Sequence, residues 1–257
     1  MTDWDKIYNG DCAPPVEGDL DELAAELAMC LGDPDPQVRD GTPYAVLRTW
    51  IARDVIDGQR RAWLGDRMAE RFTNPRIEAR TFAPLVLDMI VSRGDLRPSW
   101  QEAFARWYPA ETDLRGHDDK LGWLHAVAHG ADLLGTLGRH PEVDPAAMLD
   151  LAAARILAPT VHVYAEREDD RLASSIALTL TRPELSPQQS VAWLDPIETE
   201  LKRFTRGVTP AHVSNALRTL RMLYIHADLG MPEQHGGPRS QLTHRDLVKM
   251  RLVEMVE

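Results

Sequence analysis

Cysteine is scarce in this 257-residue chain, which holds only Cys12 and Cys30. Two cysteines do not make the disulfide framework of a small secreted domain. Long apolar runs are missing as well, since none approaches the roughly 18 residues that a membrane-spanning helix needs. The N-terminal residues are acidic and lack the apolar core of a secretory signal. We therefore expect a cytoplasmic protein with no membrane partner.

Positive charge is also in short supply. The chain has 29 Lys and Arg residues against 40 Asp and Glu residues, which gives a net charge of −11. A field of this sign repels the phosphate backbone of nucleic acids. General binding of DNA or RNA is therefore disfavoured, and the expected partner is a small molecule or another protein.

Several motifs of well-known active sites are absent. The chain has no G-x-S-x-G nucleophile elbow, no P-loop and no G-x-G-x-x-G dinucleotide motif. Cys12 lies near the N-terminus and Cys30 lies on an apolar stripe, so we do not expect a cysteine nucleophile. None of these familiar reaction types is indicated by a motif.

Strand-like alternation of polar and apolar residues is missing too, and signals for helix starts take its place. A capping residue directly before a proline recurs along the chain. The side-chain oxygen can accept a hydrogen bond from the first helical turn, where the missing N–H of proline costs no bond. These pairs are Asp35-Pro36, Thr42-Pro43, Asn74-Pro75, Asp144-Pro145, Ser186-Pro187 and Thr209-Pro210. The pattern predicts an all-α fold.

The arrangement of the expected helices favours a repeat architecture. Residues 33–53 resemble one HEAT unit, in which an Asp-Pro turn and a Val-Arg pair open a helix. About ten helices joined by short loops, with helix pairs at intervals of roughly 35–45 residues, predict a HEAT-like α-α superhelix or solenoid. We expect an irregular leader over 1–18 and a single domain over 19–257, because no Gly-, Ser- or Pro-rich linker divides the chain.

The stretch with the most chemistry-bearing residues lies inside a helix predicted over 117–137. It places His125, His129 and Asp132 at i, i+4 and i+7, within about 60° of one another on the helix. One imidazole on such a face can act as a general acid or base while the carboxylate orients an imidazole. These three are therefore the candidate catalytic residues.

A second helix, predicted over 160–181, carries a similar pattern of His162, Glu166 and Asp169. Each residue follows its counterpart in the first pattern by 37 positions. If the two helices are equivalent neighbours, imidazoles and carboxylates would meet as ligands for a divalent metal such as Zn or Mn. A metal-free polar pocket and simple surface roles remain open alternatives, so the cofactor is either none or such a metal.

Four further residues are candidates for ligand binding. Arg115 or Arg171 could hold an anionic group through a bidentate guanidinium contact, with Asp113 beside the first of them. The structural alternative pairs Arg115 with Asp113 or Glu111. Trp123 is either a core residue or a cover over a pocket.

The central stretch also carries a resemblance. Its run G-W-x-H-A-x-A-H-G-A-D, together with E-R-E-D-D-R-L-A at 166–173, resembles an uncharacterised bacterial family of helical proteins, known only as a domain of unknown function. The resemblance covers roughly residues 20–200. It implies a HEAT-like, all-helical fold and no assigned activity.

Two kinds of function fit these observations. The first is a polar His/Asp/Glu/Arg pocket on a concave face that binds a small anionic ligand, with acid–base catalysis as an open option. The alternative is a non-catalytic HEAT-like scaffold for protein partners, and a further alternative is a metal-dependent enzyme built on the two His patterns. Whether the protein is an enzyme stays open at this point.

Overall fold

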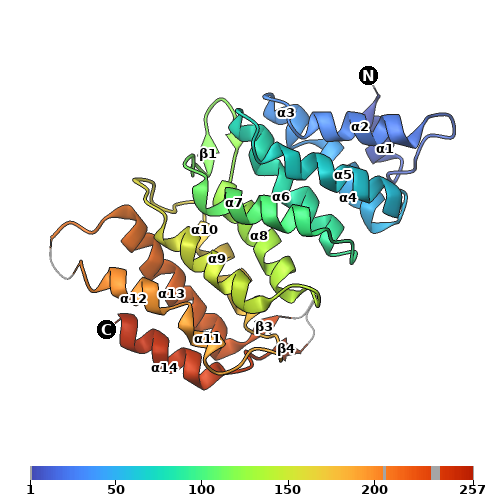
Figure 1. Ribbon diagram of the computed structural model, residues 1–257. Helices are drawn as coiled ribbons and strands as arrows, with labels where there is room; N and C mark the ends of the chain where they lie inside the picture. Colours follow the sequence, from blue (N-terminus) through green and yellow to red (C-terminus); the bar gives the residue numbers. More distant parts are fainter. Residues whose placement is uncertain (1, 205–206, 233–237, 257) are drawn as a thin grey trace.

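Helices make up most of the computed structural model, which describes residues 2–204, 207–232 and 238–256 (Figure 1). The helices are α1 (Trp4–Asn9), α2 (Leu20–Cys30), α3 (Pro36–Arg39), α4 (Thr42–Ala52), α5 (Gly58–Arg71), α6 (Ile77–Val91), α7 (Pro98–Ala110), α8 (Ala126–Arg139), α9 (Pro145–Leu157), α10 (Glu168–Thr179), α11 (Gln189–Ala192), α12 (Asp195–Leu201), α13 (Ala211–Leu229) and α14 (Arg245–Val256). Two very short antiparallel hairpins accompany them, formed by β1 (His117–Asp118) with β2 (Gly122–Trp123) and by β3 (Met231–Pro232) with β4 (Arg239–Ser240). The all-α prediction is confirmed.

The predicted capping pairs mark real helix starts, since a helix begins at or within a few residues after each of them. Asp35 caps α3 and Asp144 caps α9, and their carboxylates accept backbone hydrogen bonds at 2.9 and 3.0 Å. Pro36 and Pro145 occupy the first helical positions, where a missing N–H costs nothing. Local chemistry therefore fixes where these helices begin.

The longer helices form two rows. In the first row α4, α6, α8, α10 and α13 contact one another in this order, and in the second row α2, α5, α7, α9 and α12 do the same. From α4 to α10, successive helices alternate between the rows, and α14 packs against α13 at the end. The termini lie at opposite ends of this arrangement (Figure 1). No helix within the described ranges combines the length and the apolar character needed to cross a membrane.

The larger of two hydrophobic clusters lies between the rows, and the N-terminal segment takes part in it. Trp4 of α1 is buried and meets Trp50 of α4 edge to face, with 5.9 Å between ring centroids. The carbonyl of Cys12 accepts a hydrogen bond from Trp50 Nε1 at 2.7 Å. The prediction of an irregular leader over 1–18 is therefore wrong, because this segment contains a helix and contributes a tryptophan to the core.

Helix α8 begins at Ala126, not at 117 as predicted. Residues 117–123 form the first hairpin instead. The carboxylate of Asp118 accepts two backbone N–H groups of the turn, both at 2.9 Å. Gly122 then takes a φ of 69°, which glycine adopts without steric cost. These local bonds compete successfully with the helix.

Helix α10 also starts late, at Glu168 instead of position 160. Thr160 Oγ1 accepts the His162 N–H at 2.9 Å. The side chain of Asn215 in α13 binds the His162 carbonyl and the Tyr164 N–H, again at 2.9 Å each. Because α13 binds the backbone of this segment, the segment stays non-helical.

Candidate functional site

The β1–β2 hairpin carries Trp123 to the start of α8. Arg39 of α3 is fully buried and donates hydrogen bonds to the carbonyls of Leu121 and Trp123. A Cβ on Gly122 would lie 2.7 Å from the Cβ of Pro36, so the hairpin touches α3 directly. The indole of Trp123 nevertheless remains 44% exposed, which makes it a surface residue and not a core residue.

His125 has an unusual backbone conformation. It precedes α8 with φ 51° and ψ 38°, a left-handed backbone conformation that non-glycine residues rarely adopt. Its ring stacks on Trp123 with 4.5 Å between centroids and 5° between planes. From there a series of ring contacts, here called the ring ladder, crosses the first row. The ring ladder consists of Tyr44, Phe82, His129, His125, Trp123 and His117.

His129 occupies the middle of the ring ladder and is only 6% exposed. Its Nδ1 lies 2.9 Å from the carbonyl oxygen of Thr81 in α6. Because a carbonyl oxygen can only accept, Nδ1 carries the proton and Nε2 keeps its lone pair. Nε2 has no hydrogen-bond partner among the described residues. The neighbouring ring of His125 holds a nitrogen, Nδ1, that is both buried and without a partner among the described residues, and such an atom is costly in a folded protein and therefore informative.

Both histidines are held in the neutral form. Burial lowers the pKa of His129 to about 3, and the positive charge of Arg171 adds to the effect. Burial, followed by the charges of Arg171 and His117, lowers the pKa of His125 to about 4. A general acid or base works best with a pKa near the working pH. At neutral pH these imidazoles are therefore suited to hydrogen bonding and not to proton transfer.

Asp132 does not orient an imidazole, as the sequence had suggested. Instead Arg171 of α10 donates from Nε to Asp132 Oδ1 at 3.0 Å and from Nη2 to Oδ2. This pair ties α8 to α10 and places the guanidinium beside the two histidines. The side chain of Arg171 is 36% exposed, and its Nη1 has no hydrogen-bond partner among the described residues.

Three residues at the other end of the ring ladder were not foreseen from the sequence. Tyr44 and Arg48 lie one turn apart on α4, and Asp88 lies on α6. Arg48 is exposed and makes no ion pair within the described part of the chain, and the Tyr44 hydroxyl has no hydrogen-bond partner there. Asp88 accepts a hydrogen bond from Thr136 of α8, and its burial raises its pKa. Arg48, Asp88 and Arg171 all lie within electrostatic reach of the Tyr44 hydroxyl.

We call the group formed by Tyr44, Arg48, Asp88, His129, Asp132 and Arg171 the first-row face, since each of its helices belongs to the first row. The face combines hydrogen-bonding groups that lack partners with two arginines. The histidine pattern in the sequence points to two of its six residues, His129 and Asp132, and Arg171 was a separate candidate. No comparable signal marks Tyr44 and Arg48, whose role depends on the packing of α4 along α6.

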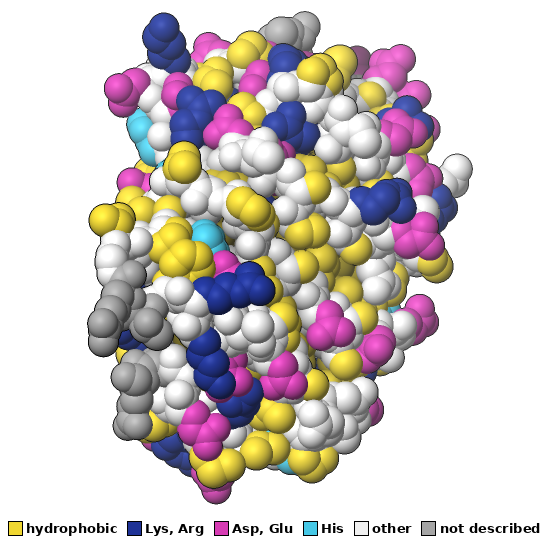
Figure 2. Space-filling model, turned by 60° about the vertical axis from the view of Figure 1, so that its left-hand side comes forward, with side chains coloured by type: hydrophobic (Ala, Val, Ile, Leu, Met, Phe, Trp, Pro, Cys, Tyr) yellow, Lys and Arg dark blue, Asp and Glu magenta, His cyan; other side chains and the backbone are white. Residues whose placement is uncertain are grey.

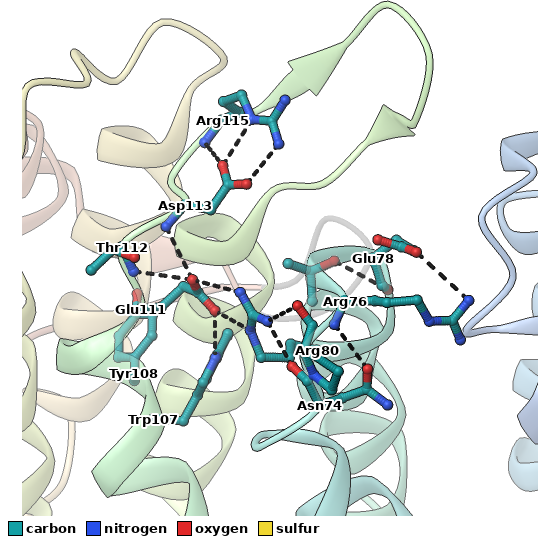
Figure 3. A network of polar contacts seen from close by, with 12 residues as sticks. Asn74, Arg76, Glu78, Arg80, Trp107, Tyr108, Glu111, Thr112, Asp113 and Arg115 are labelled. Carbon is teal, nitrogen blue, oxygen red and sulfur yellow. Dashed lines mark hydrogen bonds and ion pairs between the residues drawn. The ribbon is translucent and has the colours of Figure 1, made fainter.

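The predicted ligand residues Asp113 and Arg115 belong to a different cluster (Figure 3). Arg115 donates to Asp113 Oδ1 at 2.9 Å and to Oδ2 at 2.6 Å, and it also binds Asp118. The backbone N–H of Asp113 in turn donates to the carboxylate of Glu111 at 3.0 Å. The guanidinium of Arg115 is thus engaged by carboxylates of its own loop, which agrees with the structural alternative.

Glu111 is the centre of that cluster. Its carboxylate receives Arg80 Nε at 2.6 Å, Arg80 Nη2 at 3.0 Å and Trp107 Nε1 at 2.8 Å, together with two backbone N–H groups (Figure 3). Burial opposes the ionisation of Glu111, but these bonds outweigh it and hold the pKa of Glu111 below its usual value. We call this group the Glu111 cluster.

The second predicted pattern does not join the first. His162 and Glu166 lie in the non-helical segment before α10, and Glu166 is exposed. Asp169 is buried and accepts a hydrogen bond from Arg218 of α13 at 2.8 Å. No three His, Cys, Asp or Glu side chains in the described ranges converge as metal ligands would. The predicted metal site therefore gains no support from this geometry.

The reason is that the two patterns are not equivalent in space. His125 and Arg167 are the left-handed residues directly before α8 and α10, and 42 positions separate them. The residue of α10 that corresponds to His129 is therefore Arg171, not Glu166. In the sequence, the two patterns lie 37 residues apart at all three positions. This spacing suggested equivalent helices only because the segment before α10, which is not helical, was predicted to belong to the helix.

A large hollow lies away from the histidines, on the second row. It measures about 980 Å³ and runs between α5 and α7 over a floor that includes Phe72, Ala103, Trp107 and Ala110. The exposed face in Figure 2 also shows basic and acidic side chains interspersed with hydrophobic ones, without a large patch of one charge sign.

Comparison with known proteins places the chain in a family. A family model described as "Protein of unknown function (DUF2785)" matches residues 68–225, more than half of the chain. No curated protein and no solved structure matches the chain. The matched region contains the histidines, Asp132 and Arg171, but not Tyr44 and Arg48 of α4. The chain belongs to the DUF2785 family of proteins of unknown function.

Proposed function

We propose that this protein binds a small anionic molecule on the first-row face. The observation that carries the proposal is the buried, unpartnered Nδ1 of His125, whose ring contacts that of His129 near Arg171, a side chain that is 36% exposed. Folded proteins satisfy nearly all their buried polar groups, so an exception of this kind points to a missing partner. A ligand that hydrogen-bonds to the histidine and carries a negative charge would satisfy both groups.

The charges around the site favour an anion. Burial lowers the pKa of His129 most, and the charges of Arg171, His125 and Arg39 lower it further, so cationic groups lie near this ring. Arg48 adds a further cation that makes no ion pair with described residues. A guanidinium matches the geometry of carboxylate and phosphate oxygens. Binding is favoured over acid–base catalysis, because both imidazoles stay neutral at pH 7.

The proposal includes the architecture that presents this face. Helices alternate between the two rows from α4 to α10, which supports a short HEAT-like superhelix. In such an arrangement, corresponding side chains of successive first-row helices line one surface. Tyr44, His129 and Arg171, from three different helices, would then share one surface.

Nuclear magnetic resonance of protein labelled in its histidine rings tests the proposal. We expect acetate and inorganic phosphate, titrated at neutral pH, to shift the ring signals of His125 and His129 in a saturable way. Arg48→Gln should weaken the binding by about tenfold or more, since it removes a charge-assisted contact. The matched control is Arg139→Gln, an equally exposed arginine at the far end of α8. Shifts that never saturate, or equal weakening by both variants, would refute the proposal.

A second candidate function is a scaffold for a protein partner. The hollow of about 980 Å³ between α5 and α7 favours it, because its floor is largely apolar and it lies on the row opposite the histidines. Photocrosslinking in cells from position 103, compared with position 139, tests this option. The scaffold hypothesis requires a discrete crosslinked product from position 103 alone.

A further inference from the structure

We infer that the hollow between α5 and α7 binds a monocarboxylate with an apolar body, whose carboxylate pairs with Arg106 and whose body lies over Phe72 and Ala103. This site is separate from the first-row face, and its occupant is a small molecule in place of a protein partner. The inference follows from the shape of the hollow and from the one charge that is left unpaired in it.

Small side chains on α7 create the hollow. Ser99, Ala103 and Ala110 follow one another at intervals of four and seven residues, so they share one face of the helix, and all three line the hollow. The floor includes the rings of Phe72 and Trp107, which stack with 4.8 Å between their centroids. A volume of about 980 Å³ lies at the upper end of the range of roughly 300–1,000 Å³ that is usual for small-molecule sites. An apolar body fits this floor.

The ionised groups that line the hollow leave one positive charge unpaired. Each of its three carboxylates binds an arginine within 2.7 Å, in the pairs Asp66–Arg97, Glu70–Arg67 and Glu111–Arg80. Arg106 is the remaining ionised side chain of the lining. It is 72% exposed, and its ion pair with Glu102 spans 3.9 Å, which is too long for a hydrogen bond. The hollow therefore favours a ligand with a single negative charge.

The neutral polar groups of the lining also favour a carboxylate. Asn74 accepts a backbone N–H with Oδ1, and its Nδ2 is a donor without a partner in the described part of the chain. The hydroxyls of Ser99 and Thr112 make no hydrogen bond to described residues either. A carboxylate accepts hydrogen bonds from groups of all these kinds. An ammonium group would instead meet the unpaired guanidinium of Arg106 and be repelled.

Four probes separate the contributions of the charge and of the apolar body. Hexanoate, hexanol and hexylammonium have nearly the same size and differ in their head groups, whereas acetate keeps the carboxylate and loses the chain. We expect hexanoate to bind at least about tenfold more tightly than hexanol, because it adds a charge-assisted contact. Acetate should bind at least about tenfold more weakly than hexanoate, since it leaves the floor uncovered. Hexylammonium should bind more weakly than hexanol.

The indole N–H signals in nuclear magnetic resonance of tryptophan-labelled protein report where each probe binds. Trp100 and Trp107 line the hollow, so their signals should shift in a saturable way at pH 7. Trp50 and Trp193 are buried elsewhere and serve as internal controls. Trp123 stacks on His125 and reports binding near the first-row face.

Two variants connect the binding to particular side chains. Arg106→Gln should remove the preference for hexanoate over hexanol and leave the affinity for hexanol unchanged. Arg139→Gln, an exposed arginine outside the hollow, is the matched control and should keep the preference. Ala103→Leu fills part of the hollow and should weaken the binding of hexanoate and hexanol alike. The Tm of each variant reports whether its fold is intact.

The outcomes separate this inference from the proposed anion site. Equal binding of hexanoate and hexanol by the parent would overturn the assigned carboxylate, and tightest binding of hexylammonium would overturn it in favour of a cation. A preference for hexanoate that persists in Arg106→Gln would contradict the role of this arginine. If no probe shifts the Trp100 and Trp107 signals, the inference fails and the hollow is left to a protein partner. A shift of the Trp123 signal alone would also overturn the inference, while it would support the anion site.

Discussion

The Glu111 cluster and the first-row face both bury ionisable groups, yet they differ in how completely those groups are paired. In the cluster, the carboxylate of Glu111 receives five hydrogen bonds from Arg80, Trp107 and two backbone groups. On the first-row face, His129 Nε2 and the Arg48 guanidinium have no partner within the described residues. The first arrangement satisfies its buried groups internally, and the second leaves polar atoms available to a ligand.

This difference shows how buried polar residues can be sorted into structural and ligand-binding groups. A buried charge needs several hydrogen bonds to remain ionised, and a fold that provides all of them uses the charge to hold its elements together. A fold that fixes one nitrogen of a histidine and leaves the other without a partner keeps that second nitrogen available to a ligand. By this criterion Arg115, although a good candidate in the sequence, belongs to the structural group.

The largest expected effect comes from breaking the Glu111 cluster. Glu111→Ala leaves Arg80 without its carboxylate partner in a largely buried position and should lower the free energy of unfolding by about 3–5 kcal/mol. Glu111→Gln keeps the shape and some hydrogen bonds, so it should cost less. Urea unfolding measures both. A loss below about 1 kcal/mol for Glu111→Ala would contradict the structural role of the cluster.

The pH dependence of stability distinguishes the two regions next. His129 has a pKa of about 3 when folded, below its ordinary value of 6.5, so only the unfolded chain takes up its proton between these values. Stability is thus fully present above pH 6.5 and is lost as the pH falls toward 3. The loss from His129 should reach about 2 kcal/mol between pH 7 and pH 5. Glu111 behaves differently. Its pKa is lowered from the ordinary value of 4.5, so the stability that the ionised carboxylate contributes is lost only below pH 4.5.

The check on this prediction is urea unfolding of the parent and of His129→Asn at pH 7 and pH 5. The variant should lose about 2 kcal/mol less than the parent over this interval, whatever its stability at pH 7. The same slope in both proteins would mean that the burial of His129 does not suppress its protonation.

The helix starts could be predicted from the sequence because their causes are local. Asp35 and Asp144 bond to N–H groups two residues away, and a proline follows each of them. The hairpin over 117–123 could not be predicted, because it depends partly on Arg39, more than 80 residues earlier in the chain. A pattern consistent with a helix was therefore overridden by the local bonds of Asp118 together with this distant contact.

The candidate site, like the helices, could be predicted only in part. His125, His129, Asp132 and Arg171 lie close together as expected, although Asp132 pairs with Arg171 and not with an imidazole. The helix-wheel argument was only partly sound, since His125 lies just before α8 and reaches the site through its left-handed backbone. Arg48 entered the site only through the packing of α4, which spacing in the sequence does not reveal.

A smaller effect on stability and a larger effect on binding are expected for Arg48. It is exposed and unpaired among the described residues, so Arg48→Gln should change the free energy of unfolding by less than about 0.5 kcal/mol. Arg115→Gln provides the comparison, because it frees the carboxylates of Asp113 and Asp118 and should cost up to about 1 kcal/mol. Acetate binding should fall for Arg48→Gln and stay unchanged for Arg115→Gln. If Arg115→Gln weakened acetate binding and Arg48→Gln did not, the anion site would belong to the Glu111 cluster and not to the first-row face.

A small change in stability, and the most local test of all, is expected for Trp123. Its indole is 44% exposed, so Trp123→Ala should cost no more than about 1 kcal/mol. The same indole covers the ring of His125, whose pKa is about 4 chiefly because of burial. Removing the cover should therefore raise the pKa of His125 toward 6.5, while His129, buried beneath Phe82 and Thr81, keeps its low value. Titration of the two ring signals by nuclear magnetic resonance measures both pKa values in the variant. If the pKa values of His125 and His129 rise together, the indole of Trp123 does not shield His125 alone.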